Sequence, residues 1–483
     1  MIANGYILSI AYVFVCLTVA LLAYKLGAPK KITRKIVHIL VGFEWVILSF
    51  HFGPTPHFLA VCLLFLSLLA IDYKLKLVPA MSSEGDNAPG TVYYAVAMTV
   101  MAAVTIIIPK MMIPFGIAVF CTSFGDGFAA IFGQLIKKRN PKIYGNKTLA
   151  GALVNFCVSF SVALVFSIVF GLGFGPLELL CIAVLSTGVE LIADRGLDNI
   201  LITISVSLLS YGLIYIPETL NYIVPVLLTP FVIIVVKNKR ALTDRAIASA
   251  LVLDFVVSVA FGNIGFCVLV FFLFGSVIAD KIKKRKKNIG QNDDCANVDK
   301  SECRNIVQVI ANGLTAAVVC LAFILTGQRI FVVAYVAAMA EALADTVASG
   351  VGALSDKVYD IFRFKKCEPG LSGGMSVLGT ISALAAALLL CTLAFIGNLI
   401  TDAEFFISLI AAFLGCVFDS MLGSLSQAKY KCTVCGKTVE KSRHCDKNAD
   451  LVRGFSFITN DTVNGLSTVF SALISILMFV LII

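Results

Sequence analysis

The chain has 483 residues, of which 59% are hydrophobic and only 14% are charged, and its mean hydropathy is +0.96. A typical soluble domain is about 45–50% apolar and about 25% charged. Apolar runs of about 17–25 residues, each long enough to cross a hydrocarbon core of about 30 Å, recur from Tyr6 to Ile483. These features exclude a soluble enzyme, a secreted disulfide scaffold and a nucleic-acid-binding protein. The sequence therefore predicts an all-α polytopic membrane protein.

We expect about sixteen membrane-spanning helices, arranged in two dissimilar bundles. The first apolar run has no basic region before it and no small-residue cleavage site after it, so we expect it to be retained as a span. In chain order the expected spans are 6–24, 36–52, 57–71, 92–108, 112–136, 149–172, 177–193, 200–216, 222–236, 246–261, 264–280, 306–325, 330–349, 374–397, 404–425 and 462–483.

Basic residues are distributed unevenly over the loops between these spans. All but two of the 38 Lys and Arg residues fall in alternate loops, and the exceptions are Lys110 and Arg329. Because cytosolic loops carry the excess of Lys and Arg, the basic loops are expected in the cytosol and the N-terminus outside. The formal net charge of +9 is then a topology signal. Acidic residues at the cytosolic span ends are costly to embed and mark candidates for a site; they are Asp126, Glu190, Asp198, Asp280, Asp345 and Asp419.

The first half places basic, acidic and small residues beside these cytosolic ends. In RKIVH at 34–38, Arg34 and His38 share one helical face and Lys35 sits between them in the sequence. A plain membrane-surface anchor would also give this pattern. Asp126 lies between two glycines, and Lys147–Thr148 opens the next span after a basic loop. A carboxylate binds Mg²⁺, whereas a lysine and helix N-terminal N–H groups bind phosphate. A small-residue face alone would indicate only helix packing.

Five motifs of this half resemble the CTP-dependent lipid kinases, which include dolichol kinase, phytol kinase and the CTP-using diacylglycerol kinase. The motifs are RKIVH at 34–38, GTVYY at 90–94, GDGFAAIFG at 125–133, NKTLAG at 146–151 and VEL…DN at 189–199. The resemblance implies that Asp126 and Lys147 are catalytic in a Mg²⁺–CTP site, with His38 or a carboxylate accepting the proton of the alcohol. Ala150 stands where many of these kinases have Glu. The other implied pocket residues are Arg34, Lys35, Thr148, Glu190, Asp198 and Asn199.

The second half carries polar stripes and a glycine-rich turn of its own. Its first stripe, which interhelical hydrogen bonding would also explain, consists of Arg304, Asn305, Gln308 and Asn312. Glu341 and Asp345 lie one helical turn apart, GLSGGMS at 370–376 precedes a span, and Asp419 begins another stripe. A glycine-rich turn that leads into a helix can bind an anion.

This half resembles phytyl-phosphate kinase and its transmembrane relatives. The shared motifs are NKRALT, RNIVQVIANG, ALADTVASGVGALS, GLSGGMSVLGT, FDSMLGSLSQ and NDTVNGLS, which extend from about 238 to 470. The resemblance implies a catalytic, magnesium-binding role for Asp345 and Asp419, although Gly350 stands where relatives usually have Glu. Residues implied to bind nucleotide or phosphate are Arg304, Asn305, Gln308, Asn312, Gly373, Gly374 and Asn464.

Four further residues have the spacing of metal ligands. They are Cys432, Cys435, His444 and Cys445. Thiolates and an imidazole at CxxC…HC spacing suit tetrahedral Zn²⁺, and a cytosolic loop disfavours a disulfide. We expect a Zn²⁺ site, with metal-free thiols as the alternative. The zinc would be structural and not catalytic, because four protein ligands leave no open position for a substrate.

Together these patterns predict a bifunctional membrane phosphotransferase. Residues 1–236 would phosphorylate an isoprenoid alcohol such as phytol or geranylgeraniol with CTP and Mg²⁺. Residues 237–483, with the zinc-type loop at about 429–453, would convert the monophosphate to the diphosphate. The expected partners are the bilayer, the alcohol, its monophosphate and a nucleoside triphosphate, and no nucleic acid is expected.

Two other functions stay open. One is a single polyprenol, dolichol or diacylglycerol kinase with an inactive second half, which the departures at Ala150 and Gly350 would allow. The other is a secondary transporter, which many spans and intramembrane acids would suit. Transporter halves normally show internal symmetry, and the motifs of these two halves differ in residues and order.

Overall fold

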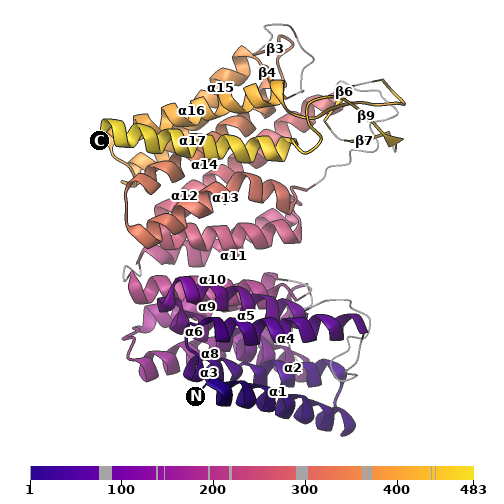
Figure 1. Cartoon of the computed structure of the whole chain (residues 1–483), viewed down its shortest axis with the longest axis vertical. Coiled ribbons are helices and arrows are strands. Elements are labelled where there is room, and N and C mark those ends of the chain that lie inside the picture. Colours follow the sequence, from indigo (N-terminus) through magenta and orange to yellow (C-terminus); the bar gives the residue numbers. More distant parts are fainter. Residues whose placement is uncertain are drawn as a thin grey trace. The chain divides into compact units, whose positions relative to one another are not determined.

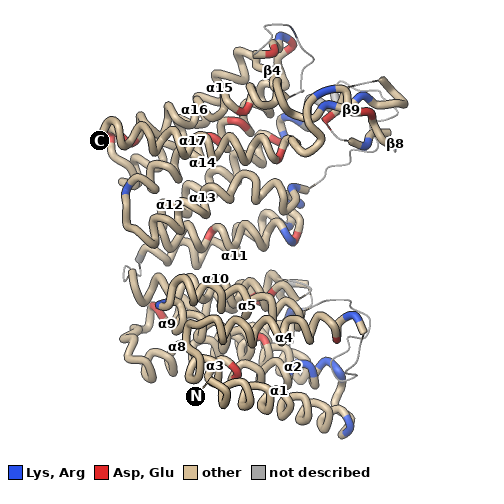
Figure 2. The backbone as a smooth tube through the Cα atoms, in the orientation of Figure 1, with Lys and Arg blue, Asp and Glu red and all other residues tan. Residues whose placement is uncertain are grey.

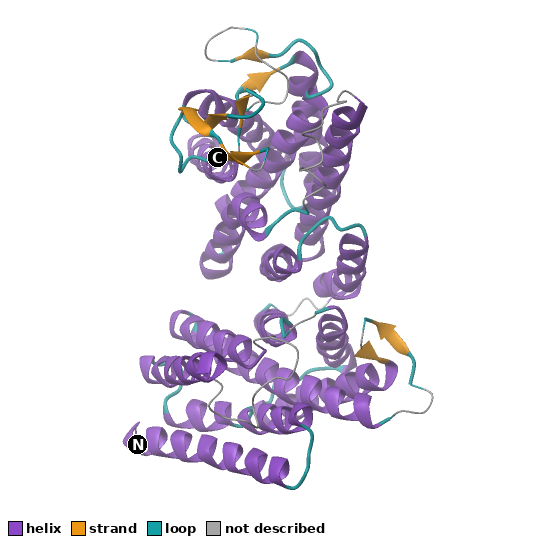
Figure 3. Cartoon of the chain, turned by 90° about the vertical axis from the view of Figure 1, so that its right-hand side faces the viewer, coloured by secondary structure: helices purple, strands orange, loops and turns teal. Residues whose placement is uncertain are grey.

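The computed structural model describes residues 2–75, 90–136, 140–145, 147–193, 196–216, 220–289, 303–361, 366, 372–436, 438–440, 442–445 and 447–483. The chain divides into two compact units, Met1–Val235 and Val236–Ile483. Both consist of long helices, with short strand pairs in the loops (Figures 1 and 3). This division and the boundary expected after residue 236 differ by one residue.

The structure confirms the fold class. Within the described residues, 13 helices are long and apolar enough to cross a membrane. Many of them expose large apolar side chains, such as Phe14, Leu68 and Ile168, as lipid-facing helices do. The chain is therefore an all-α polytopic membrane protein.

The expected count of about sixteen spans is not confirmed, and the differences lie at three places. The run 36–52 is divided between α2 (Lys30–Val41) and α3 (Glu44–His51), and both helices are too short to span. Helix α9 (Pro176–Ile192) has 17 residues and is not among the 13. Helix α12 (Asp244–Ile289) contains two of the expected spans, with a non-helical Gly262 at φ 60° inside it.

In the first unit, the helices around α10 (Asp198–Tyr215) position the polar residues. Helix α10 packs against α5, α6, α9 and η2, and most of its side chains are buried. The remaining elements are α1 (Ile2–Lys25), α4 (Pro56–Leu75), α5 (Gly90–Ile107), η1 (Pro109–Met111), α6 (Met112–Phe120), η2 (Cys121–Asp126), α7 (Gly127–Leu135), β1 (Lys142–Tyr144), β2 (Lys147–Thr148), α8 (Leu149–Phe170) and α11 (Leu220–Asn238).

The η2 segment is a π-helical turn between α6 and α7. π turns are rare and occur frequently at functional sites. Asp126 is the last residue of this turn, and Gly127 follows it because a Cβ there would lie 2.4 Å from the Ile39 side chain. The glycine thus permits close packing of α7 on α2, beside the acid.

The second unit is built around α14 (Ile330–Gly352), which packs against α12, α13, α15, α16 and α17. Its small, buried alanines allow neighbouring helices to approach closely. The other elements are α13 (Ile306–Thr326), β3 (Tyr359–Asp360), β4 (Gly374–Met375), α15 (Val377–Ile396), α16 (Asp402–Leu425), β5 (Lys429–Lys431), β6 (Thr438–Val439), β7 (Arg443–His444), β8 (Lys447–Asn448), β9 (Asp450–Arg453) and α17 (Asn460–Ile482).

The strands of this unit are short and antiparallel. β3 pairs with β4, β7 pairs with β8, and β5 lies between β6 and β9. Within each unit, most Lys and Arg residues gather toward one end of the helices (Figure 2). The cytosolic orientation of those ends remains a prediction.

Candidate functional site

In the first unit, α2 and η2 bring two basic side chains to a buried carboxylate. The Lys35 ammonium pairs with the Asp126 carboxylate, and His38 Nε2 lies 3.6 Å from Asp126 Oδ2. His38 Nε2 also lies 3.2 Å from the Thr122 carbonyl oxygen. Because a carbonyl oxygen only accepts, this contact places a proton on Nε2. Asp126 is 2% exposed, so its charge depends on these neighbours.

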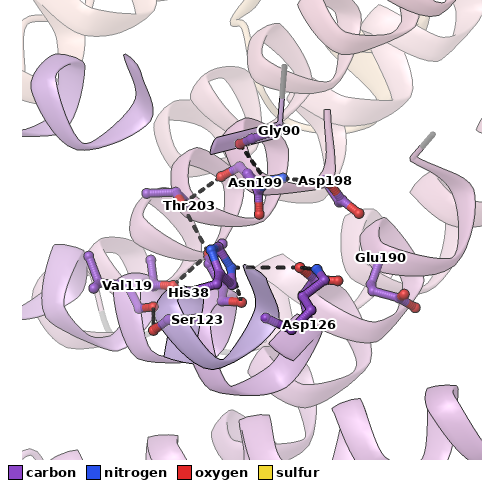
Figure 4. Close-up of polar contacts among 12 residues, drawn as sticks. His38, Gly90, Val119, Ser123, Asp126, Glu190, Asp198, Asn199 and Thr203 are labelled. Carbon is purple, nitrogen blue, oxygen red and sulfur yellow. Dashed lines mark hydrogen bonds and ion pairs between the residues drawn. The ribbon is translucent and has the colours of Figure 1, made fainter. Parts of the chain in front are cut away.

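A second ion-pair group lies beside this one. Lys147 Nζ, on β2, is 2.5 Å from Glu190 Oε1 at the end of α9 and 3.4 Å from Asp198 Oδ2 at the start of α10. Burial acts to lower the pKa of Lys147, but the Asp198 and Glu190 carboxylates raise that pKa above its ordinary value. Figure 4 shows Asp126, Glu190 and Asp198, from three different elements, around one space.

Neighbouring polar and aromatic groups hold these side chains in place. Asn199 Nδ2 donates to the Gly90 carbonyl oxygen at 2.8 Å, which ties α10 to the start of α5 (Figure 4). The Tyr94 ring meets the His38 ring edge-on, with centroids 4.8 Å apart. Thr203 and Thr122 share a hydrogen bond of 2.9 Å. Tyr94 and Thr203 were not among the expected site residues, although GTVYY at 90–94 contained the signal for Tyr94.

The other two expected residues of this half have different surroundings. Thr148 is the N-cap of α8, where its hydroxyl accepts from the Gly151 N–H at 3.3 Å. Arg34 is half-buried and makes no ion pair with any described residue. The structure therefore brings Lys35, His38 and Asn199 into the polar site and gives Thr148 a capping contact.

The second unit contains a separate group of acids. Glu341 and Asp345 lie on α14 and Asp419 lies on α16, where Ser467 of α17 donates to Asp419 Oδ2 at 3.2 Å. Glu341 is 1% exposed, and neither of its carboxylate oxygens has a hydrogen-bond partner among the described residues. A carboxyl group buried without a partner is costly. Glu341 was not among the expected site residues, and its burial on the helix that carries Asp345 makes it a candidate member of this group.

Close helix packing explains the departure at Gly350. A Cβ at this position would lie 2.7 Å from the Ala279 carbonyl oxygen on α12. A Glu side chain therefore cannot be placed here without separating α14 from α12. Glu341 lies on the same helix, two and a half turns earlier. Its packing space is made by Gly415, where a Cβ would lie 2.5 Å from Glu341 Cγ.

The polar stripe of α13 makes mainly structural contacts. Asn305 and Gln308 form a reciprocal capping box at the start of α13, and Asn312 Nδ2 donates to the Gln308 carbonyl oxygen at 3.1 Å. Arg304 Nε lies 2.9 Å from Asp280 Oδ2, and its Nη1 donates to Ser276 Oγ at 2.9 Å. In α17, the Asn464 carbonyl oxygen accepts a hydrogen bond from the Ser467 hydroxyl at 2.9 Å.

The glycine-rich turn lies against the end of α16. Gly373 has φ 84°, and a Cβ there would lie 2.4 Å from the Ser424 backbone nitrogen. Gly374 pairs with Asp360 in the β3–β4 ladder. Asp360 Oδ1 accepts from Ser424 Oγ at 2.6 Å, a contact that sequence reasoning missed because Asp360 lies outside every recognised motif.

The cysteine and histidine residues of the loop after α16 converge. The ligand atoms of Cys432, Cys435, His444 and Cys445 all lie within 4.8 Å of one another. Hydrogen bonding from the Cys435 backbone lowers the pKa of the Cys432 thiol to about 6. This group is separate from the acids of α14 and α16.

Comparisons with known proteins agree with the membrane architecture. The chain is 28% identical over 203 residues to phytol kinase from Synechocystis sp.. The aligned region covers 41% of this chain and 86% of the relative. The chain is 28% identical over 243 residues to an uncharacterized membrane protein of the same organism, covering 49% and 83% of the two chains. It is 24% identical over 245 residues to Protein VTE6, chloroplastic, from Arabidopsis thaliana, covering 49% and 65%.

No solved structure matches the chain at a significant level. Residues 227–472, just over half of the sequence, match the family model described as Integral membrane protein DUF92. This match includes the acids of α14 and α16, the glycine-rich turn and the cysteine loop. The chain belongs to the DUF92 family of integral membrane proteins.

Proposed function

We propose that this protein is a membrane-embedded kinase of isoprenoid alcohols. Its first unit would transfer a phosphoryl group from CTP to phytol, geranylgeraniol or a similar alcohol. The observation that carries this proposal is the convergence of two lysines and three acids from five elements at one site; they are Lys35, Asp126, Lys147, Glu190 and Asp198. The similarity to phytol kinase supports the substrate class.

The donor set of this site fits Mg²⁺ and a triphosphate. Asp126, Glu190 and Asp198 offer the carboxylate oxygens that Mg²⁺ prefers, and the two lysines offer charged donors for phosphate oxygens. When bound, Mg²⁺ would neutralise charge on the triphosphate, so that catalysis depends mainly on positioning. Lys35 and Lys147 pair with these carboxylates and would turn toward the phosphates of the bound nucleotide.

Proton transfer from the alcohol needs an acceptor within this site. His38 is held by the Thr122 carbonyl oxygen and the Tyr94 ring, and it lies beside Asp126. With the proton on Nε2, the acceptor would be His38 Nδ1 or a carboxylate such as Asp126. The lipid alcohol would reach them from the bilayer.

For the second unit we propose the second phosphorylation, from monophosphate to diphosphate. Glu341, Asp345 and Asp419 would supply carboxylate oxygens for Mg²⁺, and Lys283 lies on α12, which packs against α14. The acceptor is already an anion, so charge neutralisation would matter more here than a general base. The unpartnered oxygens of buried Glu341 support a cation site in the second unit. The similarity of the chain to Protein VTE6 supports its relationship to that protein.

The test is a lipid phosphorylation assay with purified protein in detergent. Geranylgeraniol or phytol, Mg²⁺ and labelled CTP should give labelled monophosphate and diphosphate. Asp126→Asn should abolish both products, whereas Asp419→Asn should let the monophosphate accumulate. Asp402→Asn, an exposed residue in the first turn of α16, is the matched control and should retain both steps.

Two results would contradict the proposal. Absence of a labelled lipid product with every nucleoside triphosphate would eliminate the kinase activity. Loss of the same single step in both Asp126→Asn and Asp419→Asn would eliminate the assignment of one step to each unit.

A further inference from the structure

The ligand atoms of the cysteine loop lie close enough together to surround one tetrahedral zinc ion. With Zn–S of about 2.3 Å and Zn–N of about 2.0–2.1 Å, sulfur and nitrogen ligands lie about 3.6 Å apart. Cys435 Sγ lies 3.6 Å from His444 Nδ1, and Cys445 Sγ lies 3.2 Å from the same atom. Cys432 Sγ belongs to the same group, within 4.8 Å of the others.

The backbone around these ligands is also arranged for thiolates. The Val434 N–H donates to Cys432 Sγ at 3.4 Å, and the Gly436 N–H donates to the Cys432 carbonyl oxygen at 3.0 Å. Gly436 has φ 70°, which lets the chain turn back after Cys435. Cys445 has φ 50°, a conformation that is costly for an L-residue and persists where surrounding contacts fix it. Coordination of a metal ion by Cys445 would supply such a contact.

The loop that carries these ligands contacts the glycine-rich turn directly. Ser372 is held from three directions: its N–H donates to Glu440 Oε1 at 2.6 Å, and its carbonyl oxygen accepts from Lys429 Nζ at 2.8 Å. Its hydroxyl accepts from Gln427 Nε2 at 3.1 Å. Lys429 lies on β5, the central strand of the small sheet, and Cys432 follows that strand.

The glycine-rich turn itself lies against α16, the helix that carries Asp419. Gly373 touches the Ser424 backbone so closely that a Cβ there would lie 2.4 Å from the Ser424 nitrogen. Arg453 of β9 donates to the Ser424 carbonyl oxygen and lies 3.9 Å from Asp360. A continuous set of contacts therefore joins the ligands, the sheet, the turn and the end of α16.

We infer that Cys432, Cys435, His444 and Cys445 bind one structural Zn²⁺, and that this centre fastens the loop 426–459 onto the turn at Ser372–Gly374. Strands of two to four residues bury too little surface to hold such a loop by themselves, and a metal commonly supplies the missing stability. The site has four protein ligands and is closed, so its role is positional. This inference goes beyond the proposed kinase function and does not depend on it.

The metal is tested by elemental analysis of purified full-length protein after incubation with ZnCl₂ and removal of the excess. Wild type should hold about one zinc per chain, and Cys432→Ser should hold at least tenfold less. Cys303→Ser changes a cysteine outside the group and should match wild type. Co²⁺ bound in place of zinc should give the visible absorption of a tetrahedral thiolate site in wild type and not in Cys432→Ser. Wild-type protein without zinc, bound iron instead of zinc, or equal zinc in Cys432→Ser would overturn the assignment.

The fastening is tested separately, by hydrogen exchange on folded wild-type protein. Removal of zinc with a chelator should raise exchange at Ser372–Gly374 at least tenfold, because the Ser372 N–H loses Glu440, while α14 stays protected. Glu440→Ala, which removes the acceptor of the Ser372 N–H, should keep its zinc and still raise exchange at Ser372. Loss of zinc without a change at Ser372–Gly374 would overturn the positional role, whatever the result of the kinase assay.

Discussion

Lys147 determines the charge balance of the first unit's site. It pairs with Glu190 and Asp198 at once, and without it two nearly buried carboxylates would repel each other. Removing one partner of such a group costs more than the pair contributes, because the remaining charge stays desolvated. Stability and function at this residue can therefore be separated by also neutralising a partner.

We predict that Lys147→Met destabilises the protein by about 1–3 kcal/mol and abolishes lipid phosphorylation. Adding Glu190→Gln should restore much of the thermal stability, because one uncompensated charge is removed, but should not restore activity. Thermal unfolding in detergent and the labelled-lipid assay measure the two effects. Lys142→Met on exposed β1 is the control, and recovery of activity in the double variant would contradict a phosphate-binding role for Lys147.

Gly350 gives a prediction about packing. A Cβ there would lie 2.7 Å from the Ala279 carbonyl oxygen, whereas at Gly465 of α17 the nearest atom would be 3.6 Å away. Gly350→Ala should therefore lose about 1–3 kcal/mol through overpacking. Gly465→Ala should be neutral or stabilise by up to about 1 kcal/mol, because alanine favours a helix. Equal melting temperatures for the two variants would show that α14 and α12 do not pack this closely.

Helix ends explain why several expected binding residues have structural contacts. Asn305, Gln308 and Thr148 were expected to bind nucleotide or phosphate, and the structure places all three in N-terminal caps. Caps and phosphate sites use the same chemistry, because both satisfy the unpaired N–H groups of a helix start. A sequence pattern cannot distinguish them.

Asn305 provides the corresponding test. Asn305→Ala should cost about 1 kcal/mol and leave the KM for nucleotide unchanged. Thr459→Ala removes the cap of α17, where Thr459 accepts from the Thr462 N–H at 3.3 Å, and should give a similar loss. A rise in KM for Asn305→Ala alone would show that Asn305 also binds the nucleotide.

The membrane topology is a property of the whole chain. Alternate loops carry nearly all Lys and Arg residues, so we predict that Lys142 faces the cytosol and that Gln328 faces the opposite side. In intact cells, a membrane-impermeant thiol reagent should label Gln328→Cys directly and Lys142→Cys only after permeabilisation. Labelling of the chain without an introduced cysteine is measured in parallel and subtracted, because the native cysteines can also react. The reverse labelling pattern would show that the chain has the opposite orientation, with both acidic sites away from the cytosol.

Most of the architecture could be read from composition and periodicity. Long apolar runs predicted the membrane helices, because only a satisfied helical backbone can cross the hydrocarbon. The runs could not show where a helix is interrupted. The division of 36–52 into α2 and α3, and the union of two runs in α12, depend on packing and on single backbone conformations.

The sites divide in the same way. The residue types and spacings of Asp126, Lys147 and Asp419 marked them as polar groups at span ends, and the CxxC…HC spacing marked the candidate metal ligands. Their partners come from distant parts of the chain, such as Lys35 with Asp126 and Ser372 with Glu440.

The sequence alone determined that this is a helical membrane protein with acids and cations at its helix ends, because hydrophobicity and charge act locally. Only the tertiary structure decided which charges compensate one another, which polar residues cap helices and which loop holds the glycine-rich turn. Those pairings depend on distances between segments far apart in the chain, and local patterns do not contain them.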